Sequence, residues 1–143
     1  MPHLVDNTVL IPEMVRLLHE GKSVTFTPTG VSMRPFIEGG QDSVILTKAD
    51  QLRVGDIVLA QITPDHYVLH RLIALHGDQV TLMGDGNLFG QEHCSRSDVL
   101  AKVQRIISPK GHRKPLTRGR LWLMLLPLRR LLLKVYRHTP RLL

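Results

Sequence analysis

The sequence predicts a mainly β domain with a helix at its start and a basic, leucine-rich tail at its end. Three observations support this prediction. Short runs of β-branched residues recur along the chain, glycine- and proline-containing turns separate them, and the charge changes sign near residue 105. Strands at that spacing are typical of a small barrel or a coiled β-sheet. We therefore expect a β domain over residues 1–105 and a tail over residues 106–143.

Length and composition are those of a single globular domain. With 143 residues, 43% of them apolar, the chain can bury a core without disulfides. Its one cysteine, Cys94, cannot form an intramolecular disulfide, which fits a reducing compartment. The N-terminus lacks a basic segment followed by an apolar stretch, so no secretory signal is visible. We expect a cytoplasmic or peripherally membrane-associated protein.

The elements before the tail follow from the spacing of apolar residues. Helical spacing predicts a helix over residues 9–20, which Gly21 ends. Residues 22–28 then alternate as a strand does, with Val24 and Phe26 on one face. Further strands are expected at the remaining apolar runs, which are 43–47, 56–62, 67–75, 79–83 and 99–107.

Charge is distributed very unevenly along the chain. Residues 1–104 hold eight Lys and Arg and all twelve acidic residues, which gives −4, whereas residues 105–143 hold eleven Lys and Arg and no acid, which gives +11. A basic tail on a slightly acidic body indicates an anionic partner, either phospholipid or nucleic acid.

The apolar part of the tail predicts which of these partners it contacts. Residues 121–137 are too short and too charged to span a membrane, where about 20 apolar residues are needed. Wound as a helix, they place Arg130, Lys134 and Arg137 opposite a leucine-rich face, which is typical of a helix in a membrane interface. Only Trp122 and Tyr136 could stack on bases, so nucleic acid is disfavoured. We expect residues 118–137 to contact an anionic membrane, although the same face could instead pack on the body.

One short turn offers a nucleophile. Ser32 lies in a turn bounded by Gly30 and Pro35, and a serine needs a base that takes its proton. His70, in an apolar strand, is the best such base, and Asp85 could orient its imidazole. Taken singly, each residue also has an ordinary structural explanation, and Asp85-Gly86 is first of all a tight turn.

Metals and organic cofactors are not expected. With a single cysteine the chain has no Cys-x-x-Cys pair, and no glycine-rich phosphate loop precedes a helix.

Four stretches taken together resemble one known family. They are Gly30-Val31-Ser32-Met33-Arg34-Pro35, Gly55-Asp56-Ile57-Val58, Val68-Leu69-His70-Arg71-Leu72-Ile73 and Gly84-Asp85-Gly86-Asn87. In residue pattern and order they resemble the type I signal peptidase superfamily, which also contains the self-cleaving SOS-type repressors. The resemblance covers about residues 22–105.

The resemblance implies a serine peptidase of the Ser-His type. Ser32 stands where the family has its nucleophile. His70-Arg71 matches the endoplasmic-reticulum and archaeal members, whereas most bacterial members have a lysine base. Asp85 matches the acidic residue of the last stretch. The turn formed by Gly30, Val31, Met33 and Pro35 would present the serine, and backbone N–H groups over residues 30–32 would bind the oxyanion. The expected reaction is hydrolysis of a precursor peptide or protein, in cis or in trans.

The sequence also departs from the family. Val31 stands where signal peptidases usually have a small residue, and neither a membrane anchor nor a DNA-binding domain precedes the matched region. Two other hypotheses therefore remain open: a non-catalytic binding module on the same fold, and a nucleic-acid-associated protein that acts through its basic tail.

Overall fold

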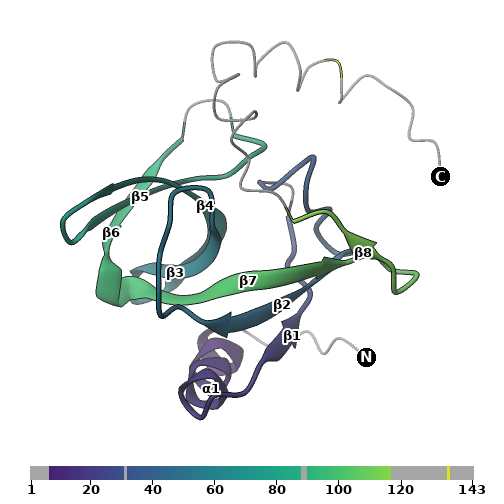
Figure 1. Cartoon of the computed structure of the whole chain (residues 1–143), viewed down its shortest axis with the longest axis horizontal. Helices are drawn as coiled ribbons and strands as arrows, with labels where there is room; N and C mark the ends of the chain where they lie inside the picture. The colour runs from purple at the N-terminus through teal and green to yellow at the C-terminus, as the bar shows by residue number, and fades with distance from the viewer. Residues whose placement is uncertain (1–6, 31, 88–89, 117–134, 136–143) are drawn as a thin grey trace.

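In the computed structural model, a curled antiparallel sheet forms a half-barrel with one helix beneath it (Figure 1). The structure describes residues 7–30, 32–87, 90–116 and 135. Of the chain, 45% is strand and 12% is helical, which confirms the prediction of a mainly β fold with a coiled sheet. The elements are α1 (Asn7–His19), β1 (Val24–Phe26), β2 (Ser43–Lys48), β3 (Ile57–Thr63), β4 (His66–His76), β5 (Gln79–Met83), β6 (Glu92–Ser95), a 3₁₀ turn (Arg96–Asp98), β7 (Val99–Ile107) and β8 (Arg113–Lys114).

The sheet follows the order β1-β2-β7-β3-β4-β5-β6, and β8 pairs with the end of β7. All pairings are antiparallel. Strand β7 joins the two ends of the fold because it pairs with β2 along most of its length and with β3 near its start. Residues from the beginning of the chain are thereby attached to the β3–β6 meander, and β4 lies near the middle of the sheet.

The helix packs its apolar face against the first strands. Ile11, Met14 and Leu18 are buried and lie three to four residues apart, so one face of α1 contacts the core beneath β1 and β2. The helix begins two residues earlier than expected, which places Pro12 inside it. Gly21 follows the helix with φ of 82°, a left-handed conformation that suits glycine and ends the helix where the sequence predicts.

Two strands were not expected from the sequence. Strand β6 is short and carries Glu92 and His93, so it has no continuous apolar run that would predict a strand. Strand β8 has only two residues and depends on its pairing with β7. Through β8, the sheet extends past residue 105 into the segment expected to be tail. The predicted C-terminal helix over 121–137 lies outside the described residues, apart from Val135.

The half-barrel has one apolar cluster on each face. Alternation along β3 sends Ile57 and Leu59 to the cluster that includes α1, whereas Val58 and Ala60 join the other cluster, inside the β3–β6 curl. Along β4, Leu69 belongs to the first cluster, and Val68 and Leu72 belong to the second. Consecutive side chains of β4 therefore lie on opposite faces of the sheet.

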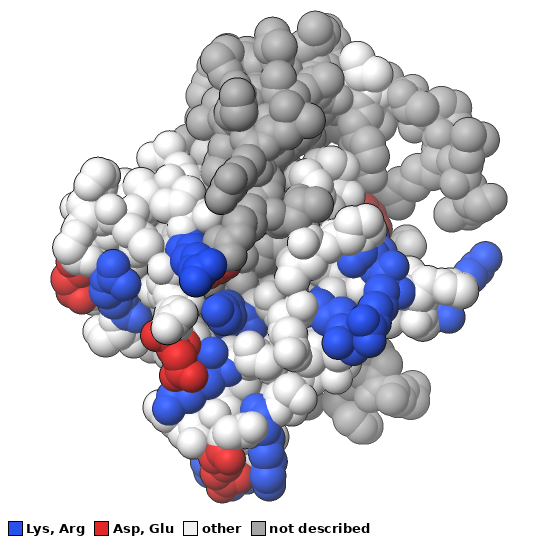
Figure 2. All heavy atoms as spheres, viewed as in Figure 1, with Lys and Arg blue, Asp and Glu red and all other residues white. Residues whose placement is uncertain are grey.

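No helix among the residues that the structure describes is both long enough and apolar enough to cross a membrane. Figure 2 shows Lys and Arg side chains gathered where the ends of β7 and β8 lie. The segment 105–114 supplies basic residues to this end of the sheet, namely Arg105, Lys110, Arg113 and Lys114.

Candidate functional site

Ser32 lies in a loop that connects β1 to β2 and is closed at its base. The Thr27 and Ser43 hydroxyl groups are 2.8 Å apart, and the Gly40 N–H donates to the Pro28 carbonyl at 2.7 Å. Gly39 packs so tightly on the Gly30 carbonyl oxygen that a Cβ added to it would lie 1.8 Å away. The loop over residues 28–42 is therefore a compact Ω-type loop whose two ends are joined.

The stretch after β5 fixes the backbone of Ser32. The Gly86 N–H donates to the Ser32 carbonyl at 2.7 Å, and the Asp85 N–H points at the Met33 sulfur at 3.4 Å. A Cβ on Gly84 would lie 2.5 Å from the same Ser32 carbonyl oxygen. Glycine at position 84 thus allows the two stretches to touch, and the contact sets the position of the serine.

His70 reaches the serine from the middle of the sheet. Its Nε2 lies 3.1 Å from Ser32 Oγ, which is hydrogen-bond distance. The histidine side chain is buried and belongs to the long strand β4, so its position is set by strand pairing on both sides. The structure therefore brings together the two residues that the sequence predicted as nucleophile and base.

A carboxylate contacts the other nitrogen of this imidazole, and it belongs to Glu92. Glu92 Oε1 is hydrogen-bonded to His70 Nδ1. Glu92 is on the edge strand β6, opposite Leu82, which is opposite Leu72 on β4. Since Leu72 and His70 share a face of β4, pairing across β5 delivers the Glu92 side chain to the face of His70.

Asp85 does not contact His70 in this arrangement, which corrects the role predicted for it. Its carboxylate binds the Arg71 guanidinium, with Nη2 donating at 2.6 Å and Nε at 3.0 Å. Both side chains are fully buried. Arg71 Nη1 donates to the Gly55 carbonyl at 2.8 Å, and the guanidinium carbon lies 5.1 Å from the centre of the Phe36 ring.

The physical reason for this correction is the alternation of β4. His70 and Arg71 are consecutive, so their side chains leave opposite faces of the sheet. Asp85 follows β5 on the face of Arg71, whereas Glu92 lies on the face of His70. The sequence contains one clue to Glu92: it is an acidic residue that follows the Gly84–Asn87 turn, where the chain could return beside β5. The clue can be used only once β6 is known to be a strand.

The remaining predicted residues surround the serine. Met33 is buried in the core and anchors the loop, and its carbonyl accepts the N–H groups of Phe36 and Ile37 at 2.9 Å. Gly30 has φ of 89°, which glycine adopts at no steric cost. Pro35 is in the same loop, partly buried, while Val31 lies outside the described residues. The predicted oxyanion donors over residues 30–32 include that residue.

In the part of the chain that the structure describes, no three His, Cys, Asp or Glu side chains come together as metal ligands would. Cys94 is half-buried on β6, where it packs against the cluster inside the curl. Burial, and secondarily the charge of Asp98, raise the pKa of its thiol above the ordinary value.

Comparison with known proteins adds no assignment. No protein-family model matches the chain, and a search of curated proteins finds no significant match.

Proposed function

We propose that this chain is a serine peptidase that cleaves a peptide bond through an acyl-enzyme. The observation that carries the proposal is the line of three side chains in which Ser32 Oγ lies 3.1 Å from His70 Nε2 and Glu92 binds His70 Nδ1. This is the order of nucleophile, base and orienting carboxylate in serine hydrolases, which are recognised by geometry rather than by sequence position.

The roles follow from the atoms in contact. Ser32 Oγ attacks the peptide carbonyl while its proton moves to His70 Nε2, and the same nitrogen then protonates the leaving amine. Water attacks the acyl-enzyme with His70 again accepting the proton. Glu92 accepts the Nδ1–H bond, which keeps Nε2 available as the base and stabilises the imidazolium as it forms.

Arg71 and Asp85 have a supporting role in this proposal. Each partner of this buried ion pair is next in sequence to a residue of the site. Arg71 follows His70, and Asp85 lies between Gly84 and Gly86, which contact Ser32. A buried pair with good geometry resists separation because either charge alone would be costly in the interior. The pair therefore fixes the β4 strand and the Gly84–Asn87 turn relative to each other.

A fluorophosphonate probe tests this proposal directly, because an activated serine attacks its phosphorus, displaces fluoride and becomes phosphonylated. Wild-type protein should gain one adduct by intact mass, with Ser32 as the modified residue, and should cleave an unstructured peptide library. Ser32→Ala and His70→Ala should show neither property, whereas Cys94→Ala serves as the control and should react as wild type does. Equal labelling of wild-type protein and Ser32→Ala would exclude Ser32 as the nucleophile. A folded wild-type protein that neither reacts nor cleaves would favour a binding module.

We also propose that the basic tail brings this peptidase to an anionic membrane surface through residues 118–137. The support comes from charge and spacing: residues 105–143 carry +11, and the leucines of the tail are spaced for one helical face. Basic residues of segment 105–114 extend the positive charge onto the end of the sheet (Figure 2).

A further inference from the structure

The loop that carries Ser32 has a second attachment, far from the imidazole, at Asp42. Asp42 is the last residue of the loop before β2 and is a buried carboxylate, with a relative exposure of 3%. Its Oδ2 accepts two donors: the Glu38 N–H at 2.8 Å and the Lys114 ammonium at 2.6 Å. Lys114 is 72 residues away along the chain.

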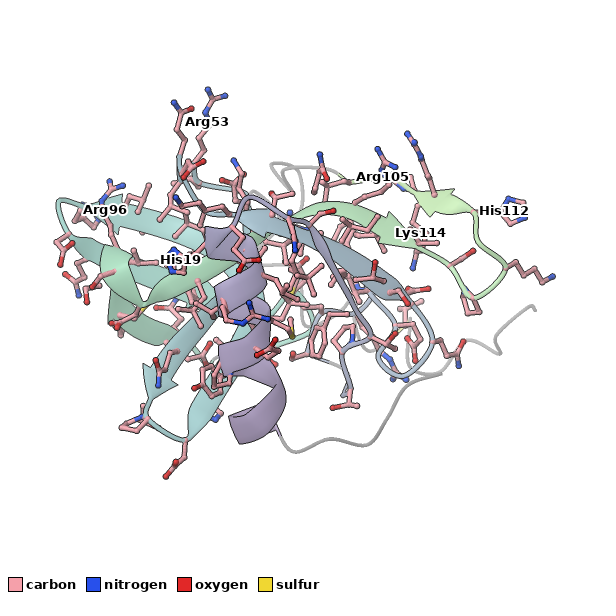
Figure 3. All side chains as sticks on the ribbon, turned by 90° about the horizontal axis from the view of Figure 1, so that it is seen from below. His19, Arg53, Arg96, Arg105, His112 and Lys114 are labelled. Carbon is pink, nitrogen blue, oxygen red and sulfur yellow. The ribbon has the colours of Figure 1, made fainter. Side chains whose placement is uncertain are left out.

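The position of Lys114 is fixed by strand pairing and by a closed hairpin. It lies on β8, whose pairing with β7 places it opposite Ile106, and the hairpin that leads to β8 is closed by the Ser108 N–H donating to the His112 carbonyl at 2.8 Å. In Figure 3, Lys114 and Arg105 extend to opposite sides of this end of the sheet. Of the basic residues at this end of the sheet, Lys114 directs its ammonium toward the loop, and its side chain is only 30% exposed.

From Asp42 the contacts continue toward the serine. The residue whose N–H binds Asp42 is Glu38, and the Glu38 carboxylate binds Arg34 through two hydrogen bonds of 2.7 and 2.9 Å. Arg34 is two residues from Ser32. The Asp42 N–H also donates to the Glu38 carbonyl at 2.9 Å, so the second half of the loop is connected to Asp42 by backbone and side chain together.

We propose that Lys114 and Asp42 are positioning residues that hold the Ser32 loop in its reactive conformation. This inference rests on the proposed function, since it concerns the same nucleophile. The start of the loop is fixed by Gly84 and Gly86 against the Ser32 backbone, and its end is fixed by this ion pair. Removing the ammonium leaves a buried carboxylate with a single backbone donor, and that charge is relieved by moving Asp42 and the loop toward water.

A small movement is enough to matter for the chemistry. The Ser32–His70 hydrogen bond exists only while the loop and β4 keep their present separation, and a shift of about 1 Å in a nucleophile can cost about 100-fold in rate. Lys114 also lies four residues before the proposed membrane contact over residues 118–137. The start of the tail is therefore attached to the loop that carries Ser32.

The test uses Lys114→Met in the full-length chain, with Lys114→Arg and Lys48→Met as companions. Lys114→Met keeps much of the aliphatic stem and removes the charge, and Lys114→Arg restores a cation. Lys48→Met is the matched control, since Lys48 pairs with Asp50 at 3.9 Å on the exposed surface. Two measurements are made: the rate and saturation of Ser32 phosphonylation by the fluorophosphonate, and hydrogen exchange of peptides covering residues 28–42.

Lys114→Met should slow the phosphonylation step by about 10- to 100-fold with little change in the probe concentration at half-saturation, because positioning affects reaction more than binding. Its loop amides should exchange faster while those of β3–β5 do not. Lys114→Arg should recover most of the rate, and Lys48→Met should match wild type in both measurements.

Three results would overturn the inference. Phosphonylation of Lys114→Met at the wild-type rate would show that the ion pair does not position the serine, even if the loop exchanged faster. Unchanged exchange over residues 28–42 would show that it does not hold the loop. Lys114→Arg that reacts as slowly as Lys114→Met would exclude a role for the cation. If wild-type protein does not react with the probe, the proposed function fails, and exchange alone then decides whether Lys114 holds the loop.

Discussion

Glu92 and His70 are hydrogen-bonded across two strand pairings, from the edge strand β6 to the central strand β4. The contact is made at Nδ1, the nitrogen that faces away from the serine. The carboxylate therefore acts on the tautomer and orientation of the imidazole, and it does so from the side of the ring opposite Ser32. Glu92 is 20% exposed at its side chain, so its loss leaves no deeply buried void.

Glu92→Gln should lower kcat strongly while the protein stays folded. The amide cannot stabilise the imidazolium and can favour the wrong tautomer, and the corresponding change in a well-studied triad costs about 10⁴-fold. We expect a fall of about 10² to 10⁴ in acylation rate, with thermal unfolding close to wild type. Gln91→Ala, on the neighbouring exposed position, is the control. A Glu92→Gln protein with the wild-type rate would remove Glu92 from the site.

Asp85→Asn should lower the free energy of unfolding. The change removes the carboxylate charge that faces the buried Arg71 guanidinium, and breaking one side of a buried ion pair costs about 3–5 kcal/mol. Urea denaturation should show this loss in the free energy of unfolding. For comparison, Glu13→Gln breaks the exposed pair with Arg16 and should change the midpoint very little. Equal midpoints for Asp85→Asn and wild type would contradict the structural role given to Asp85.

Gly84→Ala should displace Ser32. The new Cβ would lie 2.5 Å from the Ser32 carbonyl oxygen and 3.1 Å from the Ser32 Cβ, so the backbone of one stretch has to move. Overpacking of this kind costs about 1–3 kcal/mol, and acylation should slow by at least about tenfold. Gly90→Ala is the matched control because a Cβ there has no neighbour within 4 Å. If both variants react at the wild-type rate, the contact does not position Ser32.

Cys94 should be a slow thiol whose reactivity keeps rising at alkaline pH. Burial, and then the Asp98 carboxylate, raise its pKa, so less thiolate is present at a given pH than in a free cysteine. Iodoacetamide should modify the folded protein more slowly at pH 8 than it modifies the protein in urea. Asp98→Asn should speed the reaction.

The raised pKa of the Cys94 thiol also makes the free energy of unfolding depend on pH. The folded state holds the thiol proton more tightly than the unfolded chain does, so this group should reduce the free energy of unfolding once the pH rises above the ordinary thiol pKa of about 8.5. Cys94→Ser should lessen that alkaline loss. Alkylation of the folded protein at the rate seen in urea would contradict the assignment of Cys94 as a shielded thiol.

The tail should bind anionic vesicles. Co-sedimentation of the full-length chain with phosphatidylserine-containing liposomes should fall at high salt, as the charges are screened, and with neutral liposomes. Reversing Arg130, Lys134 and Arg137 to Glu should abolish it, whereas Lys22→Glu on the body should leave it unchanged. Equal pelleting of the triple variant and wild type would exclude these residues as the membrane contact.

The sequence by itself determined most of the fold. The apolar runs at 43–47, 56–62, 79–83 and 99–107 correspond to β2, β3, β5 and β7, because a strand buried on a face must carry apolar residues at fixed positions. The helix ended where Gly21 indicated, for a local conformational reason. The sequence also predicted Ser32 and His70 as one candidate site, since local motifs name residue types and order, and the structure places these two side chains in contact.

The tertiary structure alone decided which charged groups meet. Asp85 was assigned to His70 from its motif, but strand alternation turns His70 and Arg71 to opposite faces, and Asp85 shares a face with Arg71. Glu92 reaches His70 only because β6, a strand with no sequence signal of its own, pairs in one register with β5. Lys114 and Asp42 meet across 72 residues for the same reason: pairing of β8 with β7 brings them together, and neither residue type nor local spacing encodes that contact.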